Sequence, residues 1–223
     1  LQLSIHNHLN KIKSLRTVAT LVTQVVVDPE DPAFSDPSKP IGPFYSEKEA
    51  RSIEKERGWV MKEDSQRGFR RVVPSPRPRR IVEADVVKRL SADGVIVIAA
   101  GGGGVPVVED FSGMFRGIDA VIDKDLSTAL LGVEVKAGLF IDLTSVEAVF
   151  LDYNKPRQRA ISEMSVIDAK RYLAQGHFAE GSMRPKIEAA IEFLEGGGEE
   201  VIITTPSLAM EALSGRAGTR IYP

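Results

Sequence analysis

Two groups of residues in this sequence combine residue types that handle phosphate. Four consecutive glycines, 101–104, directly follow the apolar run 95–100. Glycine has no Cβ and tolerates positive φ, so the backbone N–H groups of such a run can converge on an anion. A second apolar stretch ends in Asp123, Lys124 and Asp125, which places a cation between two carboxylates. A glycine cradle beside a lysine indicates chemistry on a phosphate.

The glycine run fits neither of the common glycine-rich nucleotide motifs. It lacks the Gly-x-Gly-x-x-Gly spacing of a dinucleotide fingerprint and the Gly-Lys-Ser/Thr ending of a P-loop. A tight turn between a strand and a hairpin is the simpler explanation for a pair of glycines. Four adjacent glycines cost more chain entropy, which favours a close approach of the backbone to something else.

Lys124 and Asp125 lie where a predicted strand gives way to a predicted helix over residues 126–135. Asp125 can cap that helix, which leaves Lys124 at the edge of the sheet where ligands bind. A lysine there can neutralise a transferring phosphoryl group, and a carboxylate beside it can orient the lysine. The alternative is an ordinary solvated loop.

Two further lysines are candidates for binding an anion. Lys186 lies in the first turn of a predicted helix over 185–194, where its charge opposes the helix dipole unless an anion is present. Lys39 lies on a stiff segment with five prolines between residues 28 and 43, and could contact a small anion. For both residues a solvated surface lysine is the alternative.

The elements that must position these residues indicate an α/β fold. From residue 81 helices and strands alternate, which predicts a three-layer αβα open sandwich with a mainly parallel central sheet. Residues 28–80, with prolines at both ends, predict a small protruding lid subdomain. Residues 1–27 and 81–223 would then form the core.

The local patterns give definite element boundaries. Residues 1–13 predict the end of a helix, and 17–27 predict one nearly continuous buried strand. Residues 28–43 predict an extended loop, with neither helix nor central strand. Ser46 and Glu49 predict a capping box for a helix that ends at Gly58. The other expected elements are hairpins 59–62/69–73 and 105–108/117–122, helices 84–90, 166–174 and 207–213, and strands 95–100, 139–143, 148–151, 201–204 and 220–222.

The amino-acid composition argues against several classes of function. The net charge of −2 gives no electrostatic case for nucleic acid or an acidic membrane as a partner. The absence of cysteine excludes disulfides, thiolate zinc sites and a cysteine nucleophile, and fits a cytoplasmic protein. No apolar run is long enough to span a membrane. His6, His8 and His177 lack the spacing of a metal site, so we expect no protein-held metal.

Taken together, several segments resemble the carbamate kinases, a branch of the amino acid kinase superfamily. The resemblance covers nearly the whole chain, and although each motif alone is weak, their combination is specific. The segments are Thr23–Gln24 with Asp28–Phe34, Lys39–Phe44, Arg70–Pro76, Ala100–Val107, Val121–Asp125, Tyr153–Pro156 and Gly176–Lys186.

The resemblance implies reversible phosphoryl transfer between ATP and carbamate, giving ADP and carbamoyl phosphate, with Mg²⁺, in a homodimer that serves arginine catabolism. It implies that Lys124 and Lys186 stabilise the transferring group, that Asp125 orients them, and that Lys39 reaches the carbamate side. The phosphate and substrate loop would comprise Gly101, Gly102, Gly103 and Gly104. The adenine nucleotide would contact Tyr153, Asn154, Lys155, Phe178, Ser182 and Met183.

Two departures from the family pattern keep alternatives open. Carbamate kinases begin with a segment holding Gly-Gly-Asn-Ala and His-Gly-Asn-Gly loops, and this sequence starts after them, in the following helix. Residues 143–147 also vary the usual Leu-Thr-x-Val-Asp beside the nucleotide site. The alternatives are a truncated, non-catalytic module for nucleotide binding or dimerisation, and a sister kinase acting on another carboxylate or a nucleotide. The Lys39 subdomain argues against the sister kinase.

Overall fold

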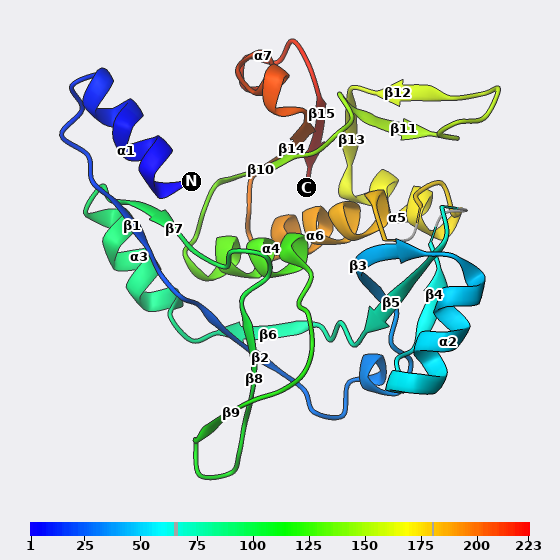
Figure 1. Cartoon of the computed structure of the whole chain (residues 1–223). Helices are drawn as coiled ribbons and strands as arrows, with labels where there is room; N and C mark the ends of the chain where they lie inside the picture. The colour runs from blue at the N-terminus through cyan, green and yellow to red at the C-terminus, as the bar shows by residue number, and fades with distance from the viewer. Residues whose placement is uncertain (65–66, 180) are drawn as a thin grey trace.

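A four-stranded sheet forms the centre of the C-terminal half. In the computed structural model, which describes residues 1–64, 67–179 and 181–223, this sheet has the order β10-β14-β15-β13 and combines parallel and antiparallel pairs. Three helices, α4, α5 and α6, cover one face (Figure 1). The bounds are β10 Leu139–Leu143, β13 Glu163–Ser165, β14 Glu200–Thr204, β15 Thr219–Tyr222, α4 Lys124–Glu134, α5 Val166–Ala174 and α6 Met183–Glu195.

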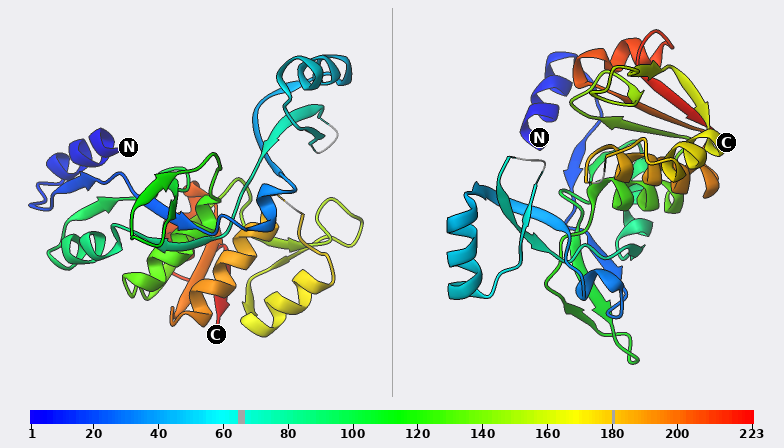
Figure 2. Two further views of the ribbon diagram at one scale, coloured as in Figure 1. Left: turned by 90° about the horizontal axis from the view of Figure 1, so that it is seen from below. Right: turned by 90° about the vertical axis from the view of Figure 1, so that its right-hand side faces the viewer.

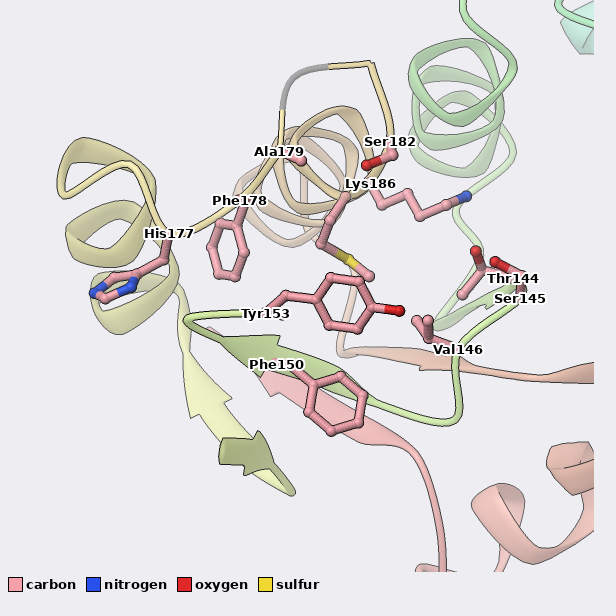
Figure 3. Close-up of a pocket in the computed structure, with 11 residues that line it drawn as sticks. Thr144, Ser145, Val146, Phe150, Tyr153, His177, Phe178, Ala179, Ser182 and Lys186 are labelled. Carbon is pink, nitrogen blue, oxygen red and sulfur yellow. The ribbon is translucent and has the colours of Figure 1, made fainter. Parts of the chain in front are cut away.

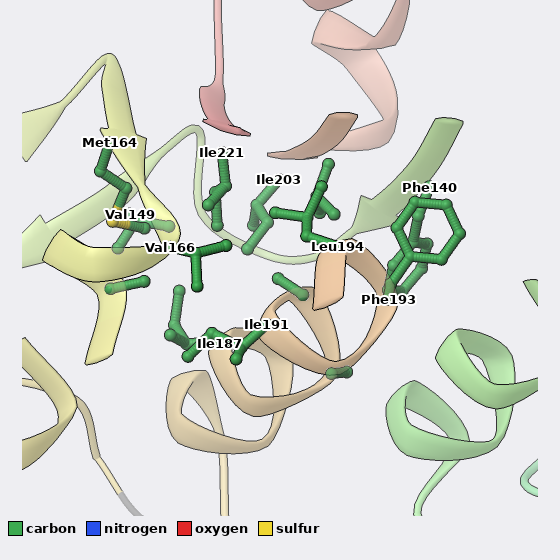
Figure 4. Close-up of a cluster of buried hydrophobic side chains, with 14 of the residues drawn as sticks. Phe140, Val149, Met164, Val166, Ile187, Ile191, Phe193, Leu194, Ile203 and Ile221 are labelled. Carbon is green, nitrogen blue, oxygen red and sulfur yellow. The ribbon is translucent and has the colours of Figure 1, made fainter. Parts of the chain in front are cut away.

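Aliphatic and aromatic side chains fill the space between this sheet and its helices (Figure 4). Phe193 of α6 is fully buried and meets Phe140 of β10 edge to face, with ring centroids 5.7 Å apart. A Cβ at Gly132 of α4 would lie only 2.8 Å from the Phe193 ring. Glycine at that position therefore allows α4 and α6 to pack closely, which brings their N-terminal ends together.

The N-terminal half of the core contains two further sheets, one of four strands and one of two. One has the order β6-β2-β8-β9, and the other pairs β1 with β7 in parallel. Helices α1 and α3 lie beside the β1–β7 pair (Figure 1). The bounds are α1 Gln2–Lys11, β1 Val18–Thr20, β2 Gln24–Val27, β6 Pro78–Ile81, α3 Ala84–Ala92, β7 Ile96–Ile98, β8 Val105–Glu109 and β9 Phe115–Gly117.

The continuous buried strand expected over residues 17–27 is wrong. The chain forms β1 and β2 in two different sheets, and Val22 between them is 76% exposed. At the crossing point, Thr23 accepts hydrogen bonds from the backbone N–H groups of Ala100 and Val105. A run of β-branched residues predicts extended backbone, but it does not show where the chain changes its partner strand.

Within residues 28–80, the part from β3 to β5 (39–73) protrudes from the rest of the chain (Figure 2), and we call this part the lid. The lid contains the sheet β3-β5-β4 and helix α2, with bounds β3 Lys39–Tyr45, α2 Glu47–Arg57, β4 Met61–Glu63 and β5 Phe69–Val73. The capping box of Ser46 and Glu49 and the left-handed Gly58 are as predicted. The expected loop over 28–43 instead contains a 3₁₀ turn, Pro32–Phe34, and the start of β3. Because β3 is an edge strand, it tolerates Pro40 and Pro43.

Several remaining predictions need smaller corrections. The strand expected over 117–122 ends at Gly117, and the helix expected over 207–213 is a 3₁₀ turn at Pro206–Leu208 followed by α7, Ala209–Leu213. The hairpin of β11, Val149–Leu151, and β12, Arg159–Ile161, was only half predicted. Residues 65 and 66 of the expected 59–73 hairpin, and residue 180 of the expected nucleotide segment, lie outside the described residues.

In the ranges that the structure describes, no helix combines the length and the apolar character needed to cross a membrane.

Candidate active site

The N-terminus of α4 is the centre of the site. Helix α4 begins at Lys124, so the capping position falls on Asp123, whose side chain accepts a hydrogen bond from the backbone N–H of Asp125 at 2.9 Å. The expectation that Asp125 caps the helix is therefore wrong. With Asp123 in that role, the carboxylate of Asp125 is available for side-chain partners.

Asp125 joins the two lysines that were predicted to act on a phosphoryl group. Lys124 Nζ lies 3.0 Å from Asp125 Oδ1, and Lys186 Nζ lies 3.1 Å from Asp125 Oδ2. Lys124 belongs to α4 and Lys186 to α6, and the close packing of these helices makes the contact possible. Because both ammonium groups touch one carboxylate, they are near enough to contact a common anion.

A third carboxylate, Asp142, was missed by the sequence analysis. It lies on β10 and accepts hydrogen bonds from Lys186 Nζ at 2.9 and 3.1 Å. Asp142 and Lys186 are both buried. The available signal was a single carboxylate within the apolar strand Leu-Phe-Ile-Asp-Leu, since a charged residue is rarely buried without a partner. The anion expected near Lys186 is thus supplied by protein carboxylates.

The pKa shifts of this buried pair follow from its surroundings. Burial raises the pKa of Asp142, and the nearby Asp125 carboxylate adds to that effect against the opposing charge of Lys186. Burial alone would lower the pKa of Lys186, but the hydrogen bonds and charges of Asp142 and Asp125 outweigh it and raise the pKa. Lys186 therefore stays an ammonium group even though its side chain is only 9% exposed.

The lid reaches the same site through Lys39. Its ammonium group forms an ion pair with Asp123 Oδ2, the oxygen that does not cap α4. Burial would raise the pKa of Asp123, but the hydrogen bond and charge of Lys39, with the Asp125 N–H, hold it below its ordinary 3.8. The structure therefore places Lys39, Lys124, Lys186 and Asp125 in one connected cluster.

The four glycines fall into two pairs with different surroundings. A Cβ at Gly103 would lie 2.1 Å from the carbonyl oxygen of Ile122, and one at Gly104 would lie 2.4 Å from Val25. These two glycines allow the loop to press against the protein itself, including the residue before Asp123. Gly101 and Gly102 face open space and line a groove of about 390 Å³. Close backbone approach thus accounts for one pair, while the other pair remains open to a ligand.

A pocket of about 180 Å³ lies beside the lysine cluster (Figure 3). Four of the residues that the resemblance assigns to the nucleotide line it, namely Tyr153, Phe178, Ser182 and Met183, and so does Lys186. Asn154 and Lys155 do not line it; they contact Gln158 and Asp152 in the neighbouring loop. The lining residues that were not predicted are Thr144, Ser145, Val146, Phe150, His177 and Ala179.

The pocket walls suit a flat apolar group with a charged end. Phe150 and Tyr153 pack together with ring centroids 5.8 Å apart, and Phe178 is buried at the back. Figure 3 shows the Lys186 side chain extending past the pocket toward Thr144 and Ser145. This combination fits a purine ring whose phosphates lead toward the lysines.

The side chains that could coordinate the expected Mg²⁺ can be compared with the usual ligands of this ion. In the described part of the chain, no three His, Cys, Asp or Glu side chains are grouped to hold a metal ion. Mg²⁺ in kinase sites is largely held by substrate phosphates and water, with one or two carboxylates. The residues present therefore fit a Mg²⁺ ion that arrives with a nucleotide.

Comparisons with known proteins show the family of this chain. Residues 14–205 match the sequence profile of the amino acid kinase family. The carbamate kinase of Thermococcus kodakarensis is 50% identical over 215 residues, covering 96% of this chain and 68% of the relative. Carbamate kinase from Giardia lamblia bound to AMP-PNP is similar with a TM-score of 0.87 and 41% identity, covering 99% of this chain and 70% of that one. The same Giardia enzyme bound to citric acid gives a TM-score of 0.92 and 40% identity, with the same coverage.

Proposed function

The chain belongs to the amino acid kinase family, and within it to the carbamate kinases; from this premise we propose how its own residues carry out phosphoryl transfer between ATP and carbamate. The observation that carries the proposal is the Asp125 carboxylate, which contacts both Lys124 and Lys186. Two ammonium groups fixed in this way can bind oxygens of the same phosphoryl group.

ATP or ADP binds in the pocket lined by Tyr153, Phe178 and Met183. The aromatic walls hold the adenine, and Ser182 at the start of α6 offers a polar contact to the nucleotide. The phosphates then extend toward Lys186, which lines the same pocket. A relative with 41% identity is bound to AMP-PNP, an ATP analogue, which supports this use of the pocket. Mg²⁺ carried on the phosphates would neutralise part of their charge.

During transfer, an oxygen of carbamate forms a bond to the terminal phosphorus of ATP. The bond from that phosphorus to the bridging oxygen breaks, and ADP leaves with the electron pair; the reverse reaction makes ATP. No protein nucleophile is needed, because phosphoryl transfer depends on positioning and on neutralising charge. Lys124 and Lys186 supply that neutralisation, and Asp125 sets their direction.

The substrate side of the site combines the glycine loop with the lid. A Cβ added at Gly101 or Gly102 would meet nothing within 4 Å, so the loop is open there to phosphate oxygens. Lys39 approaches from the lid and would contact the carbamoyl group. In this proposal residues 28–80 form the subdomain that carries the lid, on a core formed by 1–27 and 81–223.

Replacement of either core lysine by alanine tests the proposal. We expect K124A and K186A each to lower the rate of ATP synthesis from carbamoyl phosphate and ADP by about 10²- to 10⁴-fold, as for other lost transition-state charges. K62A is the matched control, because Lys62 of the lid pairs with Asp36 at the surface. Unchanged turnover in both core variants would contradict the assigned roles.

The proposal also covers the oligomeric state, the compartment and the metabolic role of the enzyme. We expect a homodimer in the cytoplasm that serves ATP formation in arginine catabolism. Turnover by this chain decides against a non-catalytic binding module, and a panel of carbamate, acetate, acetylglutamate and UMP separates the carbamate kinase from its sister kinases. Sedimentation of the purified protein tests the dimer.

A further inference from the structure

One buried carboxylate at the site has no part in the proposed reaction. Asp123 is only 6% exposed, and its two oxygens have different partners. Oδ1 accepts the backbone N–H of Asp125 at 2.9 Å, and Oδ2 pairs with Lys39 of the lid. A single side chain therefore connects the helix that carries Lys124 and Asp125 to a lysine 84 positions away in the sequence.

We propose that Asp123 is a positioning residue, which holds the lid lysine Lys39 at the phosphoryl-transfer site. The proposal rests on the function proposed above, because Lys39 is taken to contact the carbamoyl group. Asp123 itself touches neither substrate in this scheme. It acts through Lys39.

The direction of the Asp123 carboxylate is fixed by helix α4. Because Oδ1 is used as the helix cap, the position of Oδ2 follows from the start of the helix. The ammonium group of a lysine carries three N–H donors, and Asp123 occupies one of them. The Lys39 side chain is 28% exposed, so it can donate to a substrate anion while it remains bound to Asp123.

The lid is aligned with Asp123 by a second contact nearby. Lys39 lies opposite Val73 in the β3–β5 ladder. The next residue, Pro74, accepts a hydrogen bond from the backbone N–H of Val121 at 3.0 Å. The end of the lid sheet is thus joined to residues 121–123 at two points, and the Lys39–Asp123 pair is the one at which a side-chain charge can meet a ligand.

The charge state and burial of the pair distinguish it from a surface salt bridge. Asp123 has a pKa below its ordinary value because Lys39 and the Asp125 N–H stabilise its charged form, so it is ionised at neutral pH. In a second pair, Lys62 of the lid with Asp36, the side chains are 43% and 84% exposed. An exposed pair of that kind contributes little to a fixed geometry.

A double-mutant cycle tests the proposal. D123N keeps an oxygen that can cap α4, because asparagine is a good helix cap, but it removes the charge that holds Lys39. We expect D123N to lower kcat/KM for carbamoyl phosphate by about 10- to 100-fold, the loss typical of a misplaced group, with the KM for ADP unchanged. In the K39A background the same substitution should add no further loss. Equal losses in both backgrounds, or an unchanged D123N enzyme, would overturn the proposal.

The control and a second measurement separate this proposal from the proposed function. D36N makes the same change at the exposed pair of Lys62 with Asp36 and should leave all kinetic constants unaltered. Melting temperatures of the same four proteins report the pair without any reaction. A D123N shift that disappears in the K39A background supports the contact, and a shift of equal size in both backgrounds refutes it. If the wild-type protein makes no ATP from carbamoyl phosphate, the proposed function fails, and the melting cycle alone decides whether Asp123 holds Lys39.

Discussion

The core and the lid hold their functional lysines by different means. In the core, Lys186 lies on a helix packed against a sheet by fully buried residues such as Ile187 and Phe193. In the lid, the clearest contacts are arginines stacked on aromatic rings. Arg57 and Arg71 lie over Trp59, with distances of 5.0 and 4.3 Å to the ring centroid.

This difference means that the core holds its lysine rigidly, whereas the lid extends a lysine into the site from a less firmly packed subdomain. A buried cluster of aliphatic side chains fixes Lys186 in one place, since interiors are close-packed. Stacked guanidinium groups at the surface stabilise a small sheet by much less, about 0.5–1 kcal/mol for each contact. The lysines of the core are therefore held in a well-packed region, and Lys39 of the lid is held in a less stable one. The following predictions test this contrast, from the largest expected effect to the smallest.

The core charges can be tested at Asp142. In D142A the buried Lys186 loses one carboxylate and keeps its ion pair with Asp125, and we expect the free energy of unfolding to fall by about 3 kcal/mol, as when a buried pair is broken. Urea denaturation at neutral pH measures the change. The control D36A removes one partner of the exposed pair with Lys62 and should cost less than about 1 kcal/mol. A smaller loss for D142A than for D36A would contradict the contrast.

The packing of the core can be tested at Gly132. A Cβ there would meet the fully buried ring of Phe193 at 2.8 Å. We expect G132A to be destabilised, because overpacking costs about 1–3 kcal/mol and the helix propensity gained is at most about 1 kcal/mol. The measurement is the denaturation midpoint, and the control is G117A, where the added methyl meets open space. A more stable G132A would show that α4 and α6 can separate freely.

The lid can be tested at Arg57. We expect R57A to lower lid stability by about 0.5–1 kcal/mol, the value of one exposed cation–π contact. Trp59 is the only tryptophan in the chain, so its fluorescence reports on the lid alone. The fluorescence midpoint should fall while the far-UV circular dichroism midpoint stays in place, and K55A on the same helix serves as the control. If both midpoints of R57A fall together, the lid is no weaker than the core.

Features that depend on neighbouring residues could be predicted from the sequence, and features that depend on distant residues could not. Ser46, Glu49 and Gly58 define helix α2 because capping depends on neighbours within one turn. Helix α5 was predicted with its observed bounds for the same reason. The division of residues 17–27 between two sheets depends on strand partners distant in sequence, and no local pattern records it.

The candidate site divides in a similar way. Lys124, Asp125, Lys186 and Lys39 were identified from their types and from the family resemblance, and the structure brings them together. Asp142 was missed because its partner is 44 positions away, on a helix whose packing against β10 the sequence does not specify. Asp123 was passed over because the helix was expected to start two residues later than it does.

The connected cluster also determines how an anion is first met. Lys39, Lys124 and Lys186 are matched by Asp123, Asp125 and Asp142, so their formal charges cancel. A balanced cluster of this kind produces little field beyond the Debye length, about 8 Å at physiological ionic strength. Capture of a negatively charged molecule is therefore a short-range event, in which ammonium hydrogens that the carboxylates leave free bind the ligand after diffusion has already delivered it.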